Sequence, residues 1–473
     1  MGYIIVHNED LCTKLLKKVR HVAQYHYTSW NDLQAPECTT GLLRFLSKLR
    51  RLDDYIRGPV VVHCSTSHLS NYSAGVGRTG TFIAIDGLLD QCVEEGKADV
   101  FGFVSEMRKQ RNTMVQNAEQ YLFIYKALAE WYMFGETDVE VSQFREHYRV
   151  LNESQYREQQ PVINLSSSLS AVTAVVQRTT PKLQQFNGTS TPERASTAME
   201  AEYKRLERTL EPRRTCNFAH KPENVCKNRS ENAVPFDHCR IVLPVVIGSV
   251  YDSTYINASL IKGYFYPYIL AQDPMNDETC YDFWCMISEQ NSRAIVMLSS
   301  ESEFMPAEKY WPTEMGRTKT FERDSEVSIK LVGEELFSTF TLRKFTYKFA
   351  KEKTYREVMQ YCYLCWPANK IVPESTESLI DLISRVLSLQ SDFQEAGPII
   401  LHSRDGSFKT GVYCCVSLLL ERLKAENRID VFQTVRSLQQ KRPLMFTKFE
   451  QYAFCYTAVI DYLDTFNYKS TNN

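Results

Sequence analysis

The stretch VVVHCS at residues 60–65 is followed, after seven further residues, by SAGVGRTG at residues 73–80. A second stretch, ILHSRDGSFKTG at residues 400–411, has the same layout. In each, an apolar run typical of a strand precedes a polar loop with glycine, and a run with helical apolar spacing follows. Backbone N–H groups of such a loop, at the start of a helix, form a cradle for phosphate. The two stretches therefore predict two copies of a strand–loop–helix phosphate site.

Two further segments repeat in the same order around these loops. TSWND at residues 28–32 parallels LCWPA at residues 364–368, and MVQNAEQY at residues 114–121 parallels MFTKFEQY at residues 445–452. Three anchors in one order argue against chance similarity, so we expect the chain to contain a tandem duplication.

The composition of the 473 residues excludes several classes of protein. Hydrophobic residues make up 43% and charged residues 24%, as in a soluble globular protein with a sizeable core. The net charge of -2 gives no general attraction to nucleic acid or to an acidic membrane surface. The apolar runs are far shorter than the ~20 residues needed to cross a bilayer, so we expect no membrane-spanning segment here.

Cysteine usage indicates a reducing compartment and no metal site. The 14 cysteines are scattered, and the pair Cys362 and Cys365 has no second pair at the spacing of a zinc site. Without a secretion signal, such cysteines are expected to be reduced thiols in the cytoplasm.

Composition and periodicity divide the chain into four parts. Residues 1–135 alternate strand and helix signals and include a buried-strand candidate at Pro59–Val62. Ser, Thr and Gln dominate from residue 154, so residues 136–198 are expected to form a mostly flexible linker. Residues 199–468 again alternate strand and helix signals, which predicts a second α/β domain, and residues 469–473 form a tail. Helices are predicted at 41–50, 79–92, 98–111, 119–134, 199–210, 277–289, 375–388, 409–424, 430–441 and 449–466, and strands at 22–27, 59–62, 240–246, 255–259, 293–298 and 337–347.

The loops and their anchors resemble those of the protein-tyrosine phosphatases, especially the tandem intracellular domains of receptor-type members. In that family the loop reads His-Cys, five residues, Arg, and then Ser or Thr before Gly. The resemblance implies an α/β fold of the α+β type, in which helices flank a twisted mixed sheet, in two tandem copies. It also implies hydrolysis of phosphotyrosine proteins through a cysteinyl-phosphate intermediate, without a cofactor and on the cytoplasmic side of a membrane receptor. Contact between the first and second phosphatase domains, within or between molecules, is a further expectation of the resemblance.

In the first copy the resemblance assigns a role to each reacting group. Cys64 is the nucleophile, Arg78 clamps the phosphate, and Thr79 stabilises the thiolate. Asp32 is the general acid for the leaving phenolate, and Gln120 positions the attacking water. The residues that support this loop are His63, Ser73, Gly75, Gly77 and Gln116.

The first loop departs from the family rule in its length. Residues 65–77 separate Cys64 from Arg78, which makes thirteen residues where the family has five. A cradle of N–H groups works only if the loop is short and preorganised. If residues 73–78 keep the cradle conformation, Tyr72 and not Cys64 precedes them, so we expect strongly reduced activity.

The first copy is also expected to be N-terminally truncated. It has no counterparts of Lys227–Arg229, Arg240–Ser259 and Arg293–Pro312 in the second copy. The first of these segments corresponds to the phosphotyrosine-recognition loop of the family, and the others to strands. Loss of central strands exposes sheet edges and apolar faces.

The second copy keeps the loop length but not the reacting groups. Ser403 stands in place of the cysteine, and Lys409 in place of the arginine, so the planar two-pronged contact is lost. Ala368 replaces the acid, Thr447 stands where the first copy has Gln116, and Ser230 replaces the aromatic residue of the recognition loop. These five changes predict a pseudophosphatase domain. The alternative function for the chain is accordingly a non-catalytic scaffold or regulatory binding module.

Overall fold

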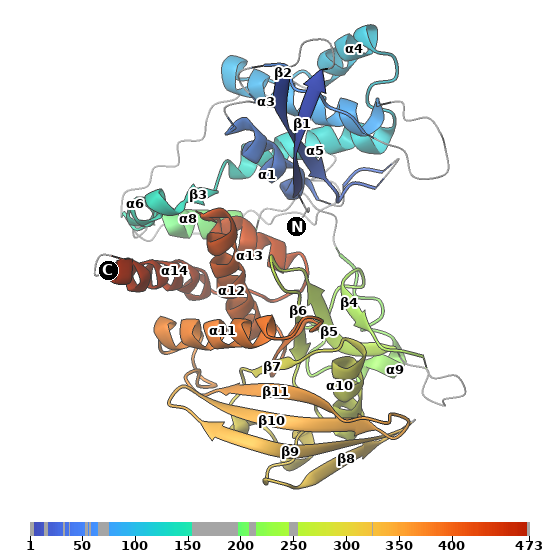
Figure 1. The fold of residues 1–473 in the computed structure, drawn as a ribbon, viewed down its shortest axis with the longest axis vertical. Coiled ribbons are helices and arrows are strands. Elements are labelled where there is room, and N and C mark those ends of the chain that lie inside the picture. Colours follow the sequence, from blue (N-terminus) through green and yellow to red (C-terminus); the bar gives the residue numbers. More distant parts are fainter. Residues whose placement is uncertain are drawn as a thin grey trace, which may run out of the picture. The chain divides into compact units, whose positions relative to one another are not determined.

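The computed structural model describes most of the chain as two compact units (Figure 1). The described residues of the first unit come from Met1–Glu136, and those of the second from Thr137–Tyr156, Ala195–Glu207 and Arg213–Asn473. The described residues are 4–13, 18–31, 34–36, 38–52, 55, 58–64, 75–153, 197–207, 214–245, 254–323 and 325–470.

A nine-stranded mixed sheet forms the centre of the second unit (Figure 1). Its four inner strands β6, β12, β7 and β11 run parallel, and the outer strands on both sides pair antiparallel. In the order of the sheet the strands are β4 (Arg240–Val242), β5 (Tyr255–Ile261), β6 (Tyr268–Gln272), β12 (Ile399–Ser403), β7 (Ala294–Met297), β11 (Arg356–Tyr363), β10 (Phe340–Phe349), β9 (Glu326–Leu336) and β8 (Thr318–Glu322).

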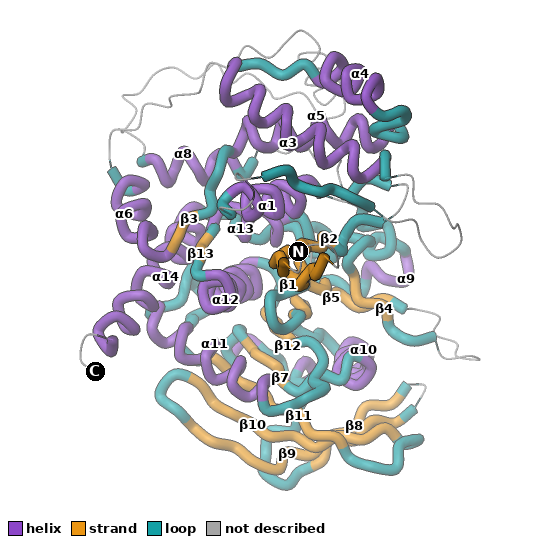
Figure 2. The backbone as a smooth tube through the Cα atoms, turned by 45° about the horizontal axis from the view of Figure 1, so that its top comes forward, coloured by secondary structure: helices purple, strands orange, loops and turns teal. Residues whose placement is uncertain are grey.

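Both faces of the inner strands are covered by helices (Figure 2). Helix α12 packs on β6 and β12 and α11 on β7, whereas α10 packs on the other face against β5 and β8. Every residue of β6, β7 and β12 is buried, as expected for parallel strands between two helical layers. Besides α6, described below, the α-helices among the described residues of this unit are α8 (Ala198–Arg205), α9 (Pro222–Val225), α10 (Asp277–Glu289), α11 (Thr376–Ser391), α12 (Phe408–Glu426), α13 (Val431–Gln439) and α14 (Phe449–Ser470).

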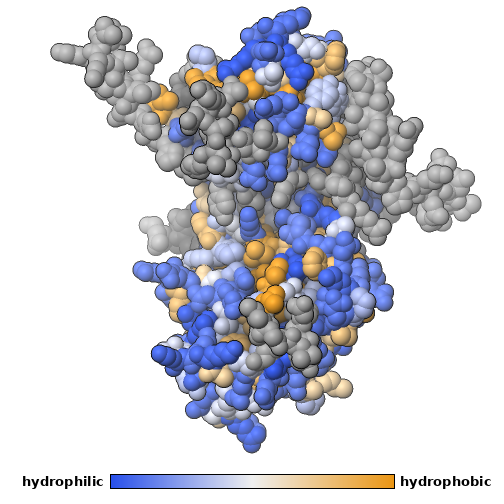
Figure 3. All heavy atoms as spheres, turned by 90° about the vertical axis from the view of Figure 1, so that its right-hand side faces the viewer, coloured by the Kyte–Doolittle hydropathy of each residue, from blue (hydrophilic) through white to orange (hydrophobic). Residues whose placement is uncertain are grey.

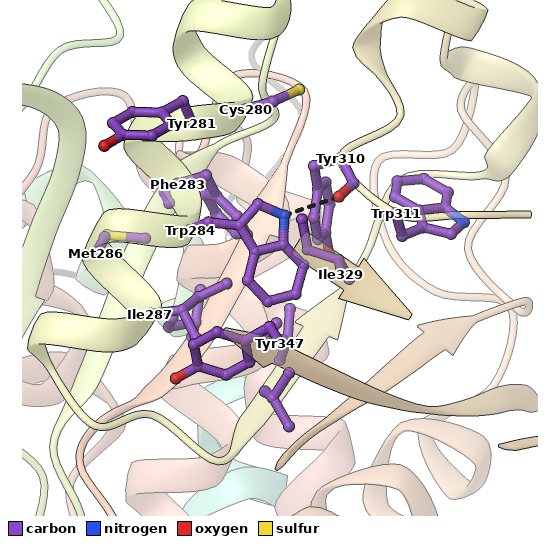
Figure 4. Close-up of a cluster of buried hydrophobic side chains, with 14 of the residues drawn as sticks. Cys280, Tyr281, Phe283, Trp284, Met286, Ile287, Tyr310, Trp311, Ile329 and Tyr347 are labelled. Atoms are coloured by element: carbon purple, nitrogen blue, oxygen red, sulfur yellow. Dashed lines mark hydrogen bonds between the residues drawn. The ribbon is translucent and has the colours of Figure 1, made fainter. Parts of the chain in front are cut away.

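The core under α10 is rich in aromatic side chains (Figure 4). Trp284 is fully buried, and its indole Nε1 donates a hydrogen bond to the carbonyl oxygen of Tyr310 at 2.8 Å. Its ring packs edge-on against Phe345 and obliquely against Tyr347 from the neighbouring strand β10. This packing fixes the segment that carries Tyr310 against the back of the sheet.

Part of the range predicted as a linker has regular structure and belongs to the second unit. Strand β3 (Val139–Glu140) pairs antiparallel with β13 (Arg428–Ile429), and helix α6 (Val141–Leu151) follows it directly. Phe144 of α6 is buried and stacks on Tyr456 of α14 with the ring planes 5° apart. Burial of such a ring supplies the apolar contact that a flexible segment lacks. Residues 154–196, where Ser, Thr and Gln dominate, lie outside the described residues.

Among its described residues, the first unit has one antiparallel hairpin and a helical core. The hairpin joins β1 (Ile4–Thr13) to β2 (Lys18–Tyr27), and Trp30, Phe82, Leu88 and Phe123 are among the buried residues of the core. The helices are α1 (Thr39–Arg50), α3 (Gly77–Glu95), α4 (Val100–Gln110) and α5 (Ala118–Phe134).

The prediction of a buried strand at Pro59–Val62 is wrong. These residues form no strand, and Val61 is 84% exposed. The equivalent strand β12 of the second unit is held by parallel neighbours on both sides, β6 and β7. No described residue of the first unit supplies such a neighbour, so the ladder that would bury the segment has no partner.

The other sequence predictions of the fold agree well with the structure. The mixed sheet with helices on both faces confirms the predicted fold class. Helix α10 has the predicted bounds, and the other predicted helices are found within a few residues, except that the helix predicted at 199–210 ends at Arg205 and is followed by a turn at residues 206–207. The surface seen in Figure 3 is mostly hydrophilic, with small groups of hydrophobic side chains. No helix among the described residues is long and apolar enough to cross a bilayer.

Candidate functional site

The structure gathers most of the second predicted site around one cavity. The cavity has a volume of about 500 Å³, and Ser230, Ala368, Ser403 and Lys409 all line it. Thr447 is not among the lining residues. The remaining walls come from Arg229, Met275, Ser299, Glu303, Arg404, Asp405 and Phe408.

The loop between β12 and α12 is held tightly against the sheet. Gly406 has a φ of +66°, which favours glycine, and an added Cβ would lie 2.5 Å from the carbonyl carbon of Ala271. The N–H of Gly406 donates to the carbonyl oxygen of Ser403 at 3.0 Å. The N–H of Ser407 donates to Oδ1 of Asp405 at 2.9 Å. Two amides of the loop are therefore already bonded within it.

Ser403 lies at the base of the cavity, and no base activates it. Its Oγ is buried and has no hydrogen-bond partner among the described residues. The neighbouring His402 is fully buried, with Nδ1 2.6 Å from Oδ1 of Asp273 and Nε2 2.9 Å from the hydroxyl of Tyr310. Both ring nitrogens are thus engaged away from Ser403, and the serine keeps a neutral hydroxyl.

His402 belongs to a buried polar network behind the loop. Gln360 Nε2 donates to the Tyr310 hydroxyl at 2.6 Å, so the tyrosine proton is directed to His402 Nε2. On the other side, Ser299 Oγ donates to Oδ2 of Asp273 at 2.6 Å. Burial raises the pKa of Tyr310 well above its usual value. The network therefore holds the end of β12 in place.

Lys409 is turned inward rather than toward the cavity mouth. Its Nζ donates to the carbonyl oxygens of Leu298 and Trp366, each at 3.1 Å, and lies 3.8 Å from Oε1 of Glu303. The side chain is only 4% exposed, and burial lowers the pKa of its ammonium group. These contacts occupy the donors that an arginine at this position would present to a phosphate.

A buried arginine supports the loop from below. Arg442 is fully buried, and its guanidinium donates to Asp405 O at 3.0 Å, Ser407 Oγ at 3.3 Å and Asn257 Oδ1 at 2.5 Å. Burial lowers its pKa to about 10. Motif reasoning did not identify this residue, because it lies 33 positions after Lys409 in the sequence. Only the folded structure brings its guanidinium into contact with the loop.

The segment that corresponds to the recognition loop is also fixed by internal pairs. Lys227 is buried beside Asp282 at 2.9 Å, and Arg229 pairs with Glu308 at 3.0 Å. Arg229 also donates to the carbonyl oxygen of Pro274 at 2.7 Å. Ser230 follows on the cavity wall, where it provides no aromatic face.

In the first unit, Arg78 is placed on the first turn of α3. Its Nη1 donates to the carbonyl oxygen of Trp30 at 2.9 Å, and Trp30 Nε1 donates to the carbonyl oxygen of Gln34 at 2.7 Å. The second unit repeats both contacts, from Lys409 to Trp366 and from Trp366 to Lys370. The Trp segment and the phosphate-loop helix therefore meet in the same way in both units.

Gln116 and Gln120 lie against the start of the same helix. A Cβ added to Gly77 would lie 2.9 Å from Gln116 Oε1 and 3.1 Å from Gln120 Nε2. The N–H of Gln116 also donates to Oε1 of Gln120 at 2.9 Å. The structure thus brings together Arg78, Gly77 and the two glutamines, with Thr79 and Gly75 on the adjoining turn. Thr79 Oγ1 is buried and has no hydrogen-bond partner among the described residues.

His63 and Cys64 differ from His402 and Ser403, the residues at the same place in the His-Cys or His-Ser motif of the second unit. His63 is exposed and Cys64 half-buried, whereas His402 and Ser403 are buried at the end of a strand. Asp32 and Ser73, the other predicted members of the site, lie outside the described residues.

The two units match in register from the phosphate-loop helix onward. Gly77 and Phe408 begin helices of 19 residues, and Gly96 and Asn427 end them with positive φ. Thr113 and Leu444, and likewise Val115 and Phe446, share positive φ values 331 positions apart. At that spacing Ser403 corresponds to Tyr72 and not to Cys64.

The comparison with known proteins follows the same two units. A family model described as "Protein-tyrosine phosphatase" matches residues 2–130 and 224–461. The chain belongs to the protein-tyrosine phosphatase family.

Its similar relatives are receptor-type phosphatases. A receptor-type tyrosine-protein phosphatase of Caenorhabditis elegans is 48% identical over 455 residues, which is 94% of this chain and 31% of the relative. The human receptor-type phosphatases alpha and epsilon are each 36% identical, and the matches cover 95% of this chain and 50% and 58% of those relatives. This phosphatase chain therefore spans between about a third and three fifths of the length of these relatives.

Among the described residues of this phosphatase chain, no three His, Cys, Asp or Glu side chains cluster in a way that could hold a metal ion.

Proposed function

We propose that this chain is a protein-tyrosine phosphatase with impaired catalysis, in which the second unit is a pseudophosphatase. The chemistry of the site is hydrolysis of a phosphotyrosine ester through a cysteinyl-phosphate intermediate. In the first unit Cys64 would attack phosphorus, Arg78 would hold the phosphoryl oxygens, and Asp32 would protonate the leaving phenolate.

The observation that carries the proposal is the register of the two units. Helices α3 and α12 begin 331 positions apart, and so do the positive-φ residues that follow them. Cys64 lies eight positions before Tyr72, the residue that this register aligns with Ser403. A sulfur atom displaced from the focus of the N–H cradle loses both the thiolate stabilisation and the attack geometry.

The second unit supports the pseudophosphatase proposal through its contacts. Ser403 has no base, and the Lys409 ammonium is bonded to two backbone carbonyl oxygens. Ala368 supplies no proton to a leaving group. A preformed loop with none of the reacting groups is suited to binding or to structural support, which makes a regulatory module the second candidate function.

Turnover of a phosphotyrosine peptide by the purified full chain tests the proposal. We expect low turnover that falls further in Cys64→Ser and does not change in Ser403→Ala. Robust turnover that depends on Cys64 would overturn the impairment of the first unit. Loss of turnover in Ser403→Ala, with the protein still folded, would overturn the pseudophosphatase assignment.

The names of the relatives support a proposal for the setting of the protein. The receptor-type names of those relatives favour a place on the cytoplasmic side of a membrane, with phosphotyrosine proteins as partners. Fractionation of cells that express the full-length product, with protease protection of this region, tests the location.

A further inference from the structure

The cavity of the second unit offers an unusual combination of groups. Phe408, Met275 and Ala368 give it apolar wall surface, and the Ser403 hydroxyl at its base has no partner among the described residues. A buried hydroxyl without a partner lacks the hydrogen bond that water would provide. A ligand with an apolar ring and one hydroxyl group would satisfy both features.

The cations around the cavity are already paired. Lys409 donates to two carbonyl oxygens, and Arg229 is bonded to Glu308 and to the carbonyl oxygen of Pro274. Arg404 is exposed at the rim and contacts the carbonyl oxygen of Glu303 at 3.3 Å. A phosphate at the base of the cavity would have to break these contacts to gain a counter-ion.

Two carboxylates also line the cavity and disfavour an anion. Asp405 accepts a hydrogen bond from the N–H of Ser407, so this N–H is not available to bind a phosphate oxygen. The Asp405 carboxylate also adds a negative charge to the cavity wall. Glu303 contributes a second carboxylate on the opposite segment. Like charges at close range in a partly buried site oppose the entry of a phosphate dianion.

Phe408 changes the shape of the cavity relative to the first unit. It stands in register with Gly77, where even a Cβ would lie 2.9 Å from the amide oxygen of Gln116. In the second unit the residue in register with Gln116 is the smaller Thr447, which leaves room for the larger side chain. The Phe408 ring packs edge-on against Trp366 with the centroids 6.4 Å apart. An aromatic wall thus replaces the polar amide that faces the start of the helix in the first unit.

We propose that this cavity binds a neutral phenol group, such as an unmodified tyrosine side chain, rather than a phosphorylated one. The phenol ring packs on Phe408 and Met275, and its hydroxyl exchanges a hydrogen bond with Ser403 Oγ. The inference rests on the proposed pseudophosphatase role of the second unit and names the chemistry that its cavity selects.

The test is a titration of the full chain, in the Cys64→Ser background, followed by NMR of 13C-labelled methionine methyl groups. The Met275 signal, assigned with Met275→Leu, reports on the cavity wall. We expect 4-methylphenol to shift this signal saturably, with a Kd on the order of 1 mM for a ligand of this size. Inorganic phosphate and 4-methylphenyl phosphate should bind at least about 10-fold more weakly, because both carboxylates oppose them.

A matched pair of ligands and variants isolates the hydroxyl contact. Toluene, which lacks the hydroxyl, should bind about 5-fold more weakly than 4-methylphenol, as expected for the loss of one hydrogen bond. Ser403→Ala should remove that difference, whereas Ser391→Ala, at the exposed end of α11, should preserve it. Asp405→Asn keeps an oxygen for the Ser407 N–H and should strengthen only the binding of the phosphate ester.

Three results would overturn the inference. They are tighter binding of the phosphate ester than of 4-methylphenol to the parent cavity, no saturable shift with 4-methylphenol, and a preference for the hydroxyl that survives Ser403→Ala. Peptide turnover, measured without the Cys64→Ser change, reports separately on the proposed function. If 4-methylphenol does not bind and turnover still does not depend on Ser403, the binding inference is wrong and the proposed pseudophosphatase role is unaffected.

Discussion

The ammonium group of Lys409 donates to the carbonyl oxygen of Trp366 at 3.1 Å. The guanidinium of Arg78 makes the same contact with Trp30 at 2.9 Å in the first unit. The cation at the start of the phosphate-loop helix therefore has a structural task that does not depend on a phosphate. That task explains how a chain can lose the arginine and keep a positive charge in its place.

Replacement of Lys409 tests this structural task. Lys409→Met leaves two buried carbonyl oxygens, of Leu298 and Trp366, without a donor, and should destabilise the second unit by about 2 kcal/mol. Lys409→Arg keeps the donors and should change stability by less than about 1 kcal/mol. Urea unfolding followed by the fluorescence of the buried Trp284, Trp311 and Trp366 measures both. Equal stability of the methionine variant and the parent would contradict the role of the two contacts.

Removal of residues 65–72 should restore the loop length of the family. The shortened loop reads His63-Cys64 followed directly by SAGVGRTG, with five residues before the arginine. Because a misplaced reacting group costs on the order of 100-fold, turnover of a phosphotyrosine peptide should rise by about that factor. The gain should disappear when Cys64→Ser is added to the deletion. If the deletion leaves turnover unchanged in a folded protein, the octapeptide is not the cause of the impairment.

Gly406 and Gly316 form a matched pair for the close contact between loop and sheet. Both have positive φ, but an added Cβ meets the backbone of Ala271 at 2.5 Å at Gly406 and nothing within 4 Å at Gly316. Gly316→Ala should cost about 1–2 kcal/mol for the left-handed backbone alone. Gly406→Ala should cost about 1–3 kcal/mol more, because the strand or the loop must move. Similar unfolding free energies for the two variants would show that the loop is not held against β6.

The second unit should lose stability in alkaline solution. Burial raises the pKa of Tyr268, Tyr310, Tyr413, Tyr452 and Tyr456 well above the usual value near 10. Above about pH 10 the unfolded chain releases these protons while the folded unit retains them. Stability should therefore fall by about 1.4 kcal/mol per pH unit for each such tyrosine.

Urea titrations between pH 9 and pH 11 measure this slope. Tyr452→Phe should reduce the slope by about one tyrosine's share, even though it also removes a hydrogen bond to Glu202. Tyr355→Phe is the control, because that ring is 61% exposed. A slope that Tyr452→Phe leaves unchanged would assign the alkaline loss to other groups.

The sequence predicted the helices well, because their apolar spacing and end signals are local. Asn276 accepts the N–H of Thr279 at the start of α10, and Gly96 ends α3 with positive φ. Strands were harder to predict. β12 is a strand because two parallel neighbours bond to it, and Pro59–Val62 has a similar apolar pattern but no such neighbours among the described residues. A strand is thus decided by distant segments, which periodicity does not detect.

The site was predicted as a set of residue types but not as a set of contacts. Motifs placed Ser403, Lys409 and Ala368 together, and the cavity contains all three. They gave no sign that Lys409 bonds to carbonyl oxygens or that Asp405 accepts an amide of its own loop. They also missed Arg442, since its partners lie on β5 and in the loop. Such contacts depend on backbone atoms, whose positions are set only by the complete fold.

The segment after Glu136 is attached to the second unit by ion pairs. Asp138 pairs with Arg422 at 2.8 Å and with Arg428 at 2.7 Å, so the chain is anchored two residues after the first unit ends. Arg422 lies near the end of α12, about 21 Å along the helix axis from Phe408 at its start. A force applied to the chain at residue 136 would therefore act through Asp138 on the C-terminal end of α12. The loop that contains Ser403 lies at the opposite, N-terminal end of this helix.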